Sequence, residues 1–247
     1  MRASRISIPL ITLVLTLVGA VQAQTIYPFF ELTDEDLERI DVTDGSIDDW
    51  LDVWGDAPLS ALDFHPLGGV TKPYDPVDLD FRLWLGWHDA TDRIYVAMER
   101  ADDIYVNPYS RSTPFLRYMQ FYDSGIEFRI DAAASGDSGY RTGFDNPTSE
   151  FYLLVNQRTQ LYGIIGETYD EGPHLQLMNF VIGAPSSPHG DWYLRPPYAE
   201  AGGTSFGERP TISVTEFYLT PFDHFVWNDP AASLASDLQV DKRILFH

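Results

Sequence analysis

Apolar and polar side chains alternate most clearly between residues 80 and 103, near the middle of the chain. Six apolar side chains recur at every second position on either side of a short polar turn over residues 88–93: Leu83, Leu85 and Trp87, then Ile94, Val96 and Met98. This period-two pattern is typical of strands that bury one face. Two such strands joined by a tight turn predict a β-hairpin.

Further segments show the same alternation, and turn residues separate them. In residues 125–131, Ile126, Phe128 and Ile130 alternate with charged side chains. Five other segments favour strands: 150–155, 161–165, 175–182, 211–219 and 243–247. Helical periodicity is almost absent. Short strands separated by turns predict an all-β protein, an antiparallel, jelly-roll-like β-sandwich.

The segments between these strands are expected to be mostly irregular. One helical turn is predicted around residues 34–39, because Thr33 suits an N-cap and Asp36 follows three residues later, as in a capping box. Residues 58–80 and 183–210, both rich in Pro and Gly, predict long loops. Loops of that length are usually functional or disordered. The second contains many aromatic residues, and we therefore expect it to pack on the sandwich.

The first 23 residues have the features of a secretory signal peptide: Arg2 and Arg5, an apolar run over residues 6–19, and a small residue before Gln24. We expect a single domain over residues 24–247, secreted or periplasmic, with no stable membrane anchor after cleavage. An uncleaved anchor is less favoured, because the apolar run is shorter than the about 20 residues of a membrane span. The chain has no Cys, which excludes disulfides and a lipid anchor on Cys.

The charge of the chain narrows the classes of partner. Asp and Glu number 37 against 16 Lys and Arg, and the net charge is −21. Such a surface repels nucleic acid and anionic lipid, and both are excluded as expected partners. A neutral ligand or a cation fits better, although many secreted proteins are acidic for solubility alone.

Short motifs occur along the chain in an order that resembles a known family. They are an Asp-Gly turn followed by a Trp (Asp44, Gly45, Trp50), an Asp pair after the hairpin (Asp102, Asp103), an Asp-x-x-Glu strand (Asp123, Glu127, Asp131), a late strand with Glu216, and a final segment over residues 240–247. In this order and spacing the chain resembles the family 9 carbohydrate-binding modules and the wider group of sugar- and haem-binding β-sandwiches. The resemblance spans residues 44–247.

The resemblance implies a sugar-binding β-sandwich, often appended to secreted enzymes that degrade polysaccharides, with structural calcium in some members. Family members with known sugar sites hold the sugar between two Trp side chains. At the first of these places the chain has Tyr118, Phe121 and Tyr122. The second place lies beyond residues 243–247, so we expect the last strands of the family's sandwich to be missing.

Aromatic residues supply the candidate sugar site. The C–H faces of a pyranose ring stack on a flat side chain, while its hydroxyls need polar partners. We expect the platform among Tyr118, Phe121, Tyr122, Trp192 and Tyr193. The alternative for residues 118–122 is ordinary packing on the core. The remaining strand-associated Trp side chains are assigned to the core: Trp50, Trp84 and Trp87.

Calcium is the candidate metal, because it is bound by several oxygen ligands from loops and strand ends. Asp102, Asp103, Asp123 and Asp131 are the residues expected to converge on it. The alternative is that Asp residues cluster by chance in so acidic a chain. Residues 41–49 superficially resemble an EF-hand loop, but their spacing is one residue short and no Glu follows at the twelfth position.

No extended catalytic motif is present. A Gly-Asp-Ser-Gly run at residues 136–139 lacks the residues that accompany it in trypsin-like proteases. We therefore expect a non-catalytic carbohydrate-binding protein that serves polysaccharide breakdown or uptake. Two alternatives remain open. One is a haem-carrying electron-transfer subunit, with ligands among Met98, Met119, Met178, His88 and His174. The other is an enzyme, or enzyme component, that hydrolyses O-glycosyl compounds.

Overall fold

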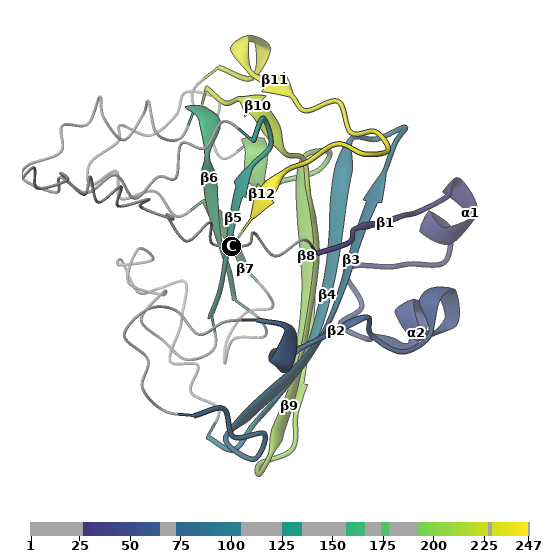
Figure 1. Cartoon of the computed structure of the whole chain (residues 1–247), viewed down its shortest axis with the longest axis vertical. Helices are drawn as coiled ribbons and strands as arrows, with labels where there is room; N and C mark the ends of the chain where they lie inside the picture. Colours follow the sequence, from purple (N-terminus) through teal and green to yellow (C-terminus); the bar gives the residue numbers. More distant parts are fainter. Residues whose placement is uncertain are drawn as a thin grey trace, which may run out of the picture.

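The computed structural model describes residues 27–64, 73–104, 125–134, 157–165, 174–177, 192–226 and 229–246. These residues form an all-β fold in which two main sheets face each other, and two short helices lie on the outer side of the larger sheet (Figure 1). The predicted fold class is confirmed. Within the described ranges, neither helix is long or apolar enough to cross a lipid bilayer.

The larger sheet has the strand order β1-β3-β4-β9-β8, with β2 also paired to β3. Its strands are β1 (Phe30–Glu31), β2 (Leu59–Ser60), β3 (Leu79–His88), β4 (Arg93–Asp102), β8 (Ala199–Phe206) and β9 (Thr211–Leu219). Only the short β1 pairs in parallel within it. The predicted hairpin is confirmed as β3 and β4, which pair from Leu79 with Asp102 to His88 with Arg93.

The smaller sheet has the order β12-β5-β6-β7 and is antiparallel throughout. Its strands are β5 (Gly125–Asp131), β6 (Gln160–Ile165), β7 (His174–Leu177) and β12 (Leu245–Phe246). A short antiparallel pair, β10 (Phe222–His224) and β11 (Leu234–Ala235), lies near it. The four strands of the smaller sheet fall on segments that were predicted as strands, whereas β10 and β11 were not predicted. The predicted strand at residues 150–155 and the end of the one at 175–182 lie outside the described residues.

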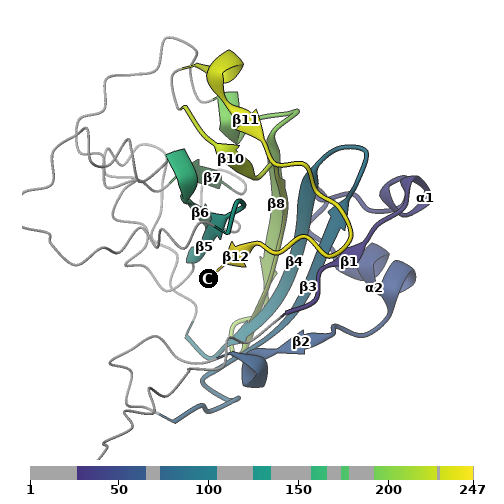
Figure 2. The same ribbon diagram turned by 45° about the horizontal axis from the view of Figure 1, so that its top comes forward.

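The main core lies between the two sheets (Figure 2). It is built from the apolar side chains at alternate positions: Leu83, Leu85, Ile94, Val96, Phe217 and Leu219 from the larger sheet, and Phe128, Ile130, Tyr162 and Ile164 from the smaller one. This is the face that period-two alternation predicted. Trp87 packs partly buried against the same core.

The other face of the larger sheet is covered by residues 32–57, which include α1 (Asp34–Leu37) and α2 (Asp48–Trp54). A second apolar cluster forms there. Trp50 and Trp84 are fully buried in it, as predicted, together with Tyr95, Ala97 and Tyr218. Both faces of this sheet are therefore covered where the N-terminal segment crosses it.

The predicted helical turn is confirmed as α1. The hydroxyl of Thr33 accepts a hydrogen bond from the Asp36 amide (3.2 Å), and the Thr33 amide donates to the Asp36 carboxylate (2.9 Å). The second helix, α2, was not predicted. Its acidic first turn favours an N-terminus, and Trp50 packs against Trp54 at i, i+4 spacing.

Two expectations about loops were wrong. Residues 58–80 contain β2, and residues 183–210 contain β8. The sequence of β8, AEAGGTSF, has low β-propensity, and its glycine has a packing reason. A Cβ atom at Gly202 would lie 2.4 Å from the carbonyl oxygen of Val42. The N-terminal segment crosses β8 so closely that no side chain fits there.

Candidate functional site

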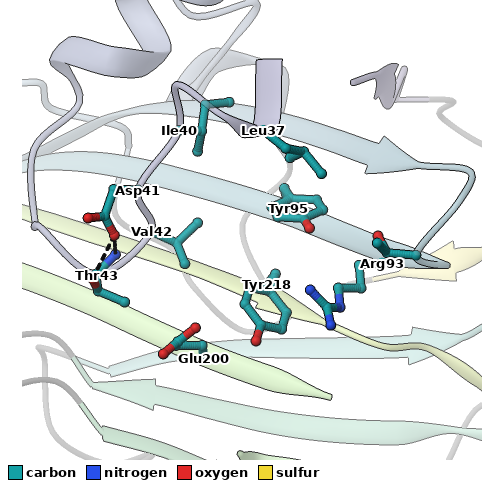
Figure 3. Close-up of a pocket in the computed structure, with 10 residues that line it drawn as sticks. Leu37, Ile40, Asp41, Val42, Thr43, Arg93, Tyr95, Glu200 and Tyr218 are labelled. Carbon is teal, nitrogen blue, oxygen red and sulfur yellow. Dashed lines mark hydrogen bonds between the residues drawn. The ribbon is translucent and has the colours of Figure 1, made fainter. Parts of the chain in front are cut away.

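A pocket of about 300 Å³ opens on the outer face of the larger sheet (Figure 3). It lies between residues 37–43 of the N-terminal segment and strands β4, β8 and β9. This volume is at the lower end for small-molecule sites. Its lining combines apolar side chains with an arginine, two carboxylates and hydroxyl groups.

Two tyrosines form the inner surface of the pocket. Tyr95 of β4 and Tyr218 of β9 are register partners, and their ring centroids lie 5.7 Å apart. The guanidinium of Arg93 lies 4.4 Å from the centroid of the Tyr218 ring, so it covers one face of that ring. Burial and the carboxylate of Glu200 raise the pKa of Tyr218 to about 12, although Arg93 acts in the opposite direction. The phenol is therefore neutral, and a hydrogen-bond donor, at physiological pH.

The opposite wall is a polar loop. The carboxylate of Asp41 accepts hydrogen bonds from the Thr43 hydroxyl (2.6 Å) and the Thr43 amide (3.0 Å), as Figure 3 shows. These bonds lower the pKa of Asp41 below its ordinary value. Asp41 from the loop and Glu200 from β8 thus add two acceptors to the lining of the pocket. Such a lining suits a small neutral ligand rich in hydroxyl groups.

A second cluster lies on the same face of β9, two residues before Tyr218. The indole N–H of Trp50 donates to Oε1 of Glu216 at 2.6 Å and joins residues 166 positions apart. Glu216 is fully buried, and its Oε2 has no hydrogen-bond partner in the protein. Burial, with smaller contributions from Asp49 and Asp44, raises the pKa of Glu216 to about 8.

Asp44, Asp49 and Glu216 each place one carboxylate oxygen within 4.8 Å of the others. Among the residues that the structure describes, this is the one group of three or more Asp, Glu or His side chains with metal-ligand spacing. The structure thus brings together four residues of the family motifs: Asp44, Gly45, Trp50 and Glu216. Sequence reasoning named each of them but did not place them in one site. The one feature of the sequence that pointed to this cluster was Glu216, a charged residue among apolar residues in a predicted strand.

The predicted sugar-binding residues divide between described and undescribed parts of the chain. Tyr118, Phe121 and Tyr122 lie outside the described residues. Trp192 and Tyr193 lie in a short 3-10 helix (Trp192–Leu194), where both are partly buried against the core. The expected packing of this loop on the sandwich is therefore confirmed. The platform role of these side chains stays a prediction.

Trp192 and Tyr193 belong to an aromatic cluster with residues of β8, β10 and the following turn. The Trp192 ring centroid lies 4.7 Å from that of Tyr198 and 5.6 Å from that of Phe222. The Tyr193 ring meets Phe225 edge-on at 5.0 Å. These contacts fix both rings.

Three of the four aspartates predicted to bind calcium are described, and they lie at or directly after strand ends, as expected. Asp102 ends β4, where its side chain accepts a hydrogen bond from the Ile104 amide (3.0 Å). Asp103 follows it, and its amide donates to the Asp78 carbonyl (3.2 Å). Asp131 ends β5 in the other sheet and is buried. Asp123 lies outside the described residues, and the prediction of calcium at these four residues stays a prediction.

Two candidate haem ligands are described. Met98 is partly buried against the main core. The ring nitrogens of buried His88 contact the Asp34 carboxylate (3.2 Å) and the Thr91 hydroxyl (3.0 Å). Met119 and Met178 lie outside the described residues, as does the side chain of His174.

Comparisons with known proteins returned structural matches alone. No family model matches the chain, and no curated protein matches it. One similar solved structure is a family 9 carbohydrate-binding module from Caldicellulosiruptor kristjanssonii in complex with cellotriose. It is 13% identical, with a TM-score of 0.39, and the match covers 88% of this chain and 72% of that one.

A second similar structure is a family 9 module from the same organism in complex with glucose. It is 14% identical, with a TM-score of 0.33, and the match covers 76% of this chain and 68% of that one. Both structures belong to the family that the motif residues resemble. The fold assignment rests on the strands and registers described above.

Proposed function

We propose that this protein is a secreted, non-catalytic carbohydrate-binding protein that acts in polysaccharide breakdown or uptake, and that its sugar site is the pocket on the outer face of the larger sheet. The observation that carries the proposal is the lining of that pocket, which combines Tyr95 and Tyr218 with the acceptors Asp41 and Glu200.

The chemistry of a sugar matches this lining. A pyranose has apolar C–H faces, which pack on aromatic and aliphatic side chains, and hydroxyls around its rim, which donate readily to carboxylates. A hydrogen bond to a charged group is worth about 1.5–3 kcal/mol. A neutral sugar is also not repelled by a chain with a net charge of −21.

Arg93 has a defined part in this site. Its guanidinium already covers one face of Tyr218, so the sugar would meet the edge of that ring and the donor groups of the arginine. We therefore propose recognition that depends on polar contacts more than on open stacking. One monosaccharide unit, such as a chain end, suits the volume of the pocket better than the middle of a polysaccharide.

A binding screen tests the function. Residues 24–247 would be applied to a glycan array and to insoluble polysaccharides, beginning with glucose and cellotriose, the ligands of the two similar modules. Saturable binding to a neutral glycan supports the proposal. Binding to no glycan by a folded sample, judged by a cooperative unfolding transition, would overturn it.

A further inference from the structure

The carboxylate cluster of Asp44, Asp49 and Glu216 is separate from the residues that line the pocket. Carboxylates at this spacing repel one another when all three are ionised, and the repulsion grows where water is excluded. Two ligands of one Ca²⁺ ion, each about 2.4 Å from it, can lie up to about 4.8 Å apart. The measured spacing of the three oxygens, within 4.8 Å, falls inside that limit.

Glu216 supplies a second, independent observation. Its side chain is fully buried and held by Trp50, yet Oε2 has no hydrogen-bond partner in the protein. A buried carboxylate oxygen without a partner costs free energy, and proteins rarely leave one. The carboxylate faces Asp44 and Asp49, which supply acceptors rather than donors. A cation is the ligand that satisfies all three groups.

We propose that Asp44, Asp49 and Glu216 bind a divalent cation of the calcium class. Hard oxygen donors from three different kinds of element, a turn, the first turn of α2 and strand β9, favour Ca²⁺, which accepts variable geometry, over Mg²⁺, which demands a regular octahedron. The site is distinct from the four aspartates that sequence reasoning suggested for calcium. It also lacks the spacing of an EF-hand, because one ligand comes from β9, far along the chain.

The cation site is connected to the wall of the sugar pocket. The Asp41 amide donates to the carboxylate of Asp49 (2.7 Å), and the Ser46 amide donates to that of Asp44 (2.8 Å). A cation bound between these aspartates and β9 would therefore hold residues 41–49 against the sheet. Asp41 and Thr43 at the pocket depend on the same loop, so the cation would also order that wall.

The test uses the cation alone, without sugar, so its outcome is independent of the proposed function. The full chain after signal cleavage would be treated with EDTA, then titrated with Ca²⁺ by calorimetry and with Tb³⁺ by luminescence. Trp50, which contacts Glu216 directly, would sensitise the bound Tb³⁺. Salt near 0.15 M screens the diffuse attraction of an acidic surface. We expect one saturable site.

Conservative variants localise the site. Glu216→Gln and Asp44→Asn keep a side-chain oxygen as acceptor for Trp50 and Ser46, and each should weaken Ca²⁺ binding at least tenfold. The matched control Asp56→Asn removes one exposed charge elsewhere and should bind as the wild type does. Saturable binding that Glu216→Gln and Asp44→Asn leave unchanged would overturn the assignment.

The melting temperature gives a second test of the cation site, one that does not require the variants to bind Ca²⁺. Ca²⁺ should raise the melting temperature of the wild type, because it binds the folded state. In EDTA, Glu216→Gln should melt at or above the wild type, since the amide of Gln can donate to the acceptors Asp44 and Asp49 that lie beside it. A wild type with no saturable site and no rise in melting temperature would contradict the proposal.

Discussion

At the scale of single residues, Glu216 is the residue that most departs from the apolar pattern around it. Its register neighbours are small, Ala97 on β4 and Gly202 on β8. Small neighbours leave room on this face for the Trp50 ring and the loop that crosses the sheet. A charged side chain can be recognised in the sequence of a predicted strand, but its partner 166 residues away cannot.

The Trp50–Glu216 hydrogen bond should be measurable in stability. Trp50→Phe keeps an aromatic ring but removes the N–H donor, which leaves both oxygens of buried Glu216 without a protein partner. We expect the free energy of unfolding to fall by about 1–3 kcal/mol in urea titrations at about pH 9, where Glu216 with its pKa of about 8 is ionised, with EDTA present. In the Glu216→Gln background the same change should cost less, because no buried charge is left unpaired. Equal losses in both backgrounds would show that only ring packing matters.

At the scale of elements, strong period-two alternation was sufficient to predict the strands β3, β4, β5, β6 and β9. One face of each of these strands is buried in the main core. The alternation failed for β8, where small residues replace it. It also failed to suggest α2, because the seven residues of this helix span only about two turns, too few for a helical pattern to stand out. The pocket was missed for a related reason. Tyr95 and Tyr218 meet only through the pairing of β4 with β9, and sequence patterns do not specify which strands pair.

The N-terminal segment crosses β8 so closely that we expect Gly202 to tolerate no larger residue. In Gly202→Ala the new Cβ would meet backbone atoms of Val42 and Thr43 at 2.4–2.7 Å, so the crossing segment must move. We expect a loss of about 1–3 kcal/mol in the free energy of unfolding, as for overpacked cores. Phe206→Ala, an exposed change in the same strand, should have a much smaller effect. Denaturant unfolding of both variants gives the comparison, and a Gly202→Ala protein as stable as the wild type would refute the close crossing.

The capping box of α1 predicts a pH dependence with a defined sign. Hydrogen bonds from the Thr33 amide and hydroxyl lower the pKa of Asp36 below its ordinary value of 3.8 in the folded protein. A lowered pKa stabilises the fold above the unfolded pKa, and this contribution is lost as pH falls through the folded value. Asp36→Ala should therefore be less stable than the wild type at neutral pH, and the difference should shrink below about pH 4. Melting curves against pH would show this, whereas a constant difference would contradict it.

At the scale of the whole molecule, one sheet carries two different faces. Its inner face packs on the smaller sheet, and its outer face holds the N-terminal segment, the pocket and the carboxylate cluster (Figure 1). The sequence was sufficient to predict the sandwich and the inner face. It could not predict that a segment beginning near residue 32 covers the outer face, because that segment has weak periodicity and its contacts on β8 and β9 are distant in sequence.

The proposed sugar site rests on this arrangement, and it predicts unequal effects of conservative changes. Glu200→Gln removes a charged acceptor at the pocket and should weaken sugar binding about tenfold, the equivalent of one charge-assisted hydrogen bond. Tyr218→Phe removes one hydroxyl from the same pocket and should weaken it less. Tyr162→Phe removes a buried hydroxyl from the core and should leave sugar affinity unchanged.

The most direct test of the central claim is the calorimetric affinity of one glycan, chosen from the binding screen, for the wild type, Glu200→Gln and Trp192→Ala. The proposed site predicts that Glu200→Gln binds about ten times more weakly and that Trp192→Ala, if folded, binds as the wild type does. Unchanged binding by Glu200→Gln together with lost binding by Trp192→Ala would contradict the pocket as the site and place sugar recognition on the aromatic residues at 192 and 193.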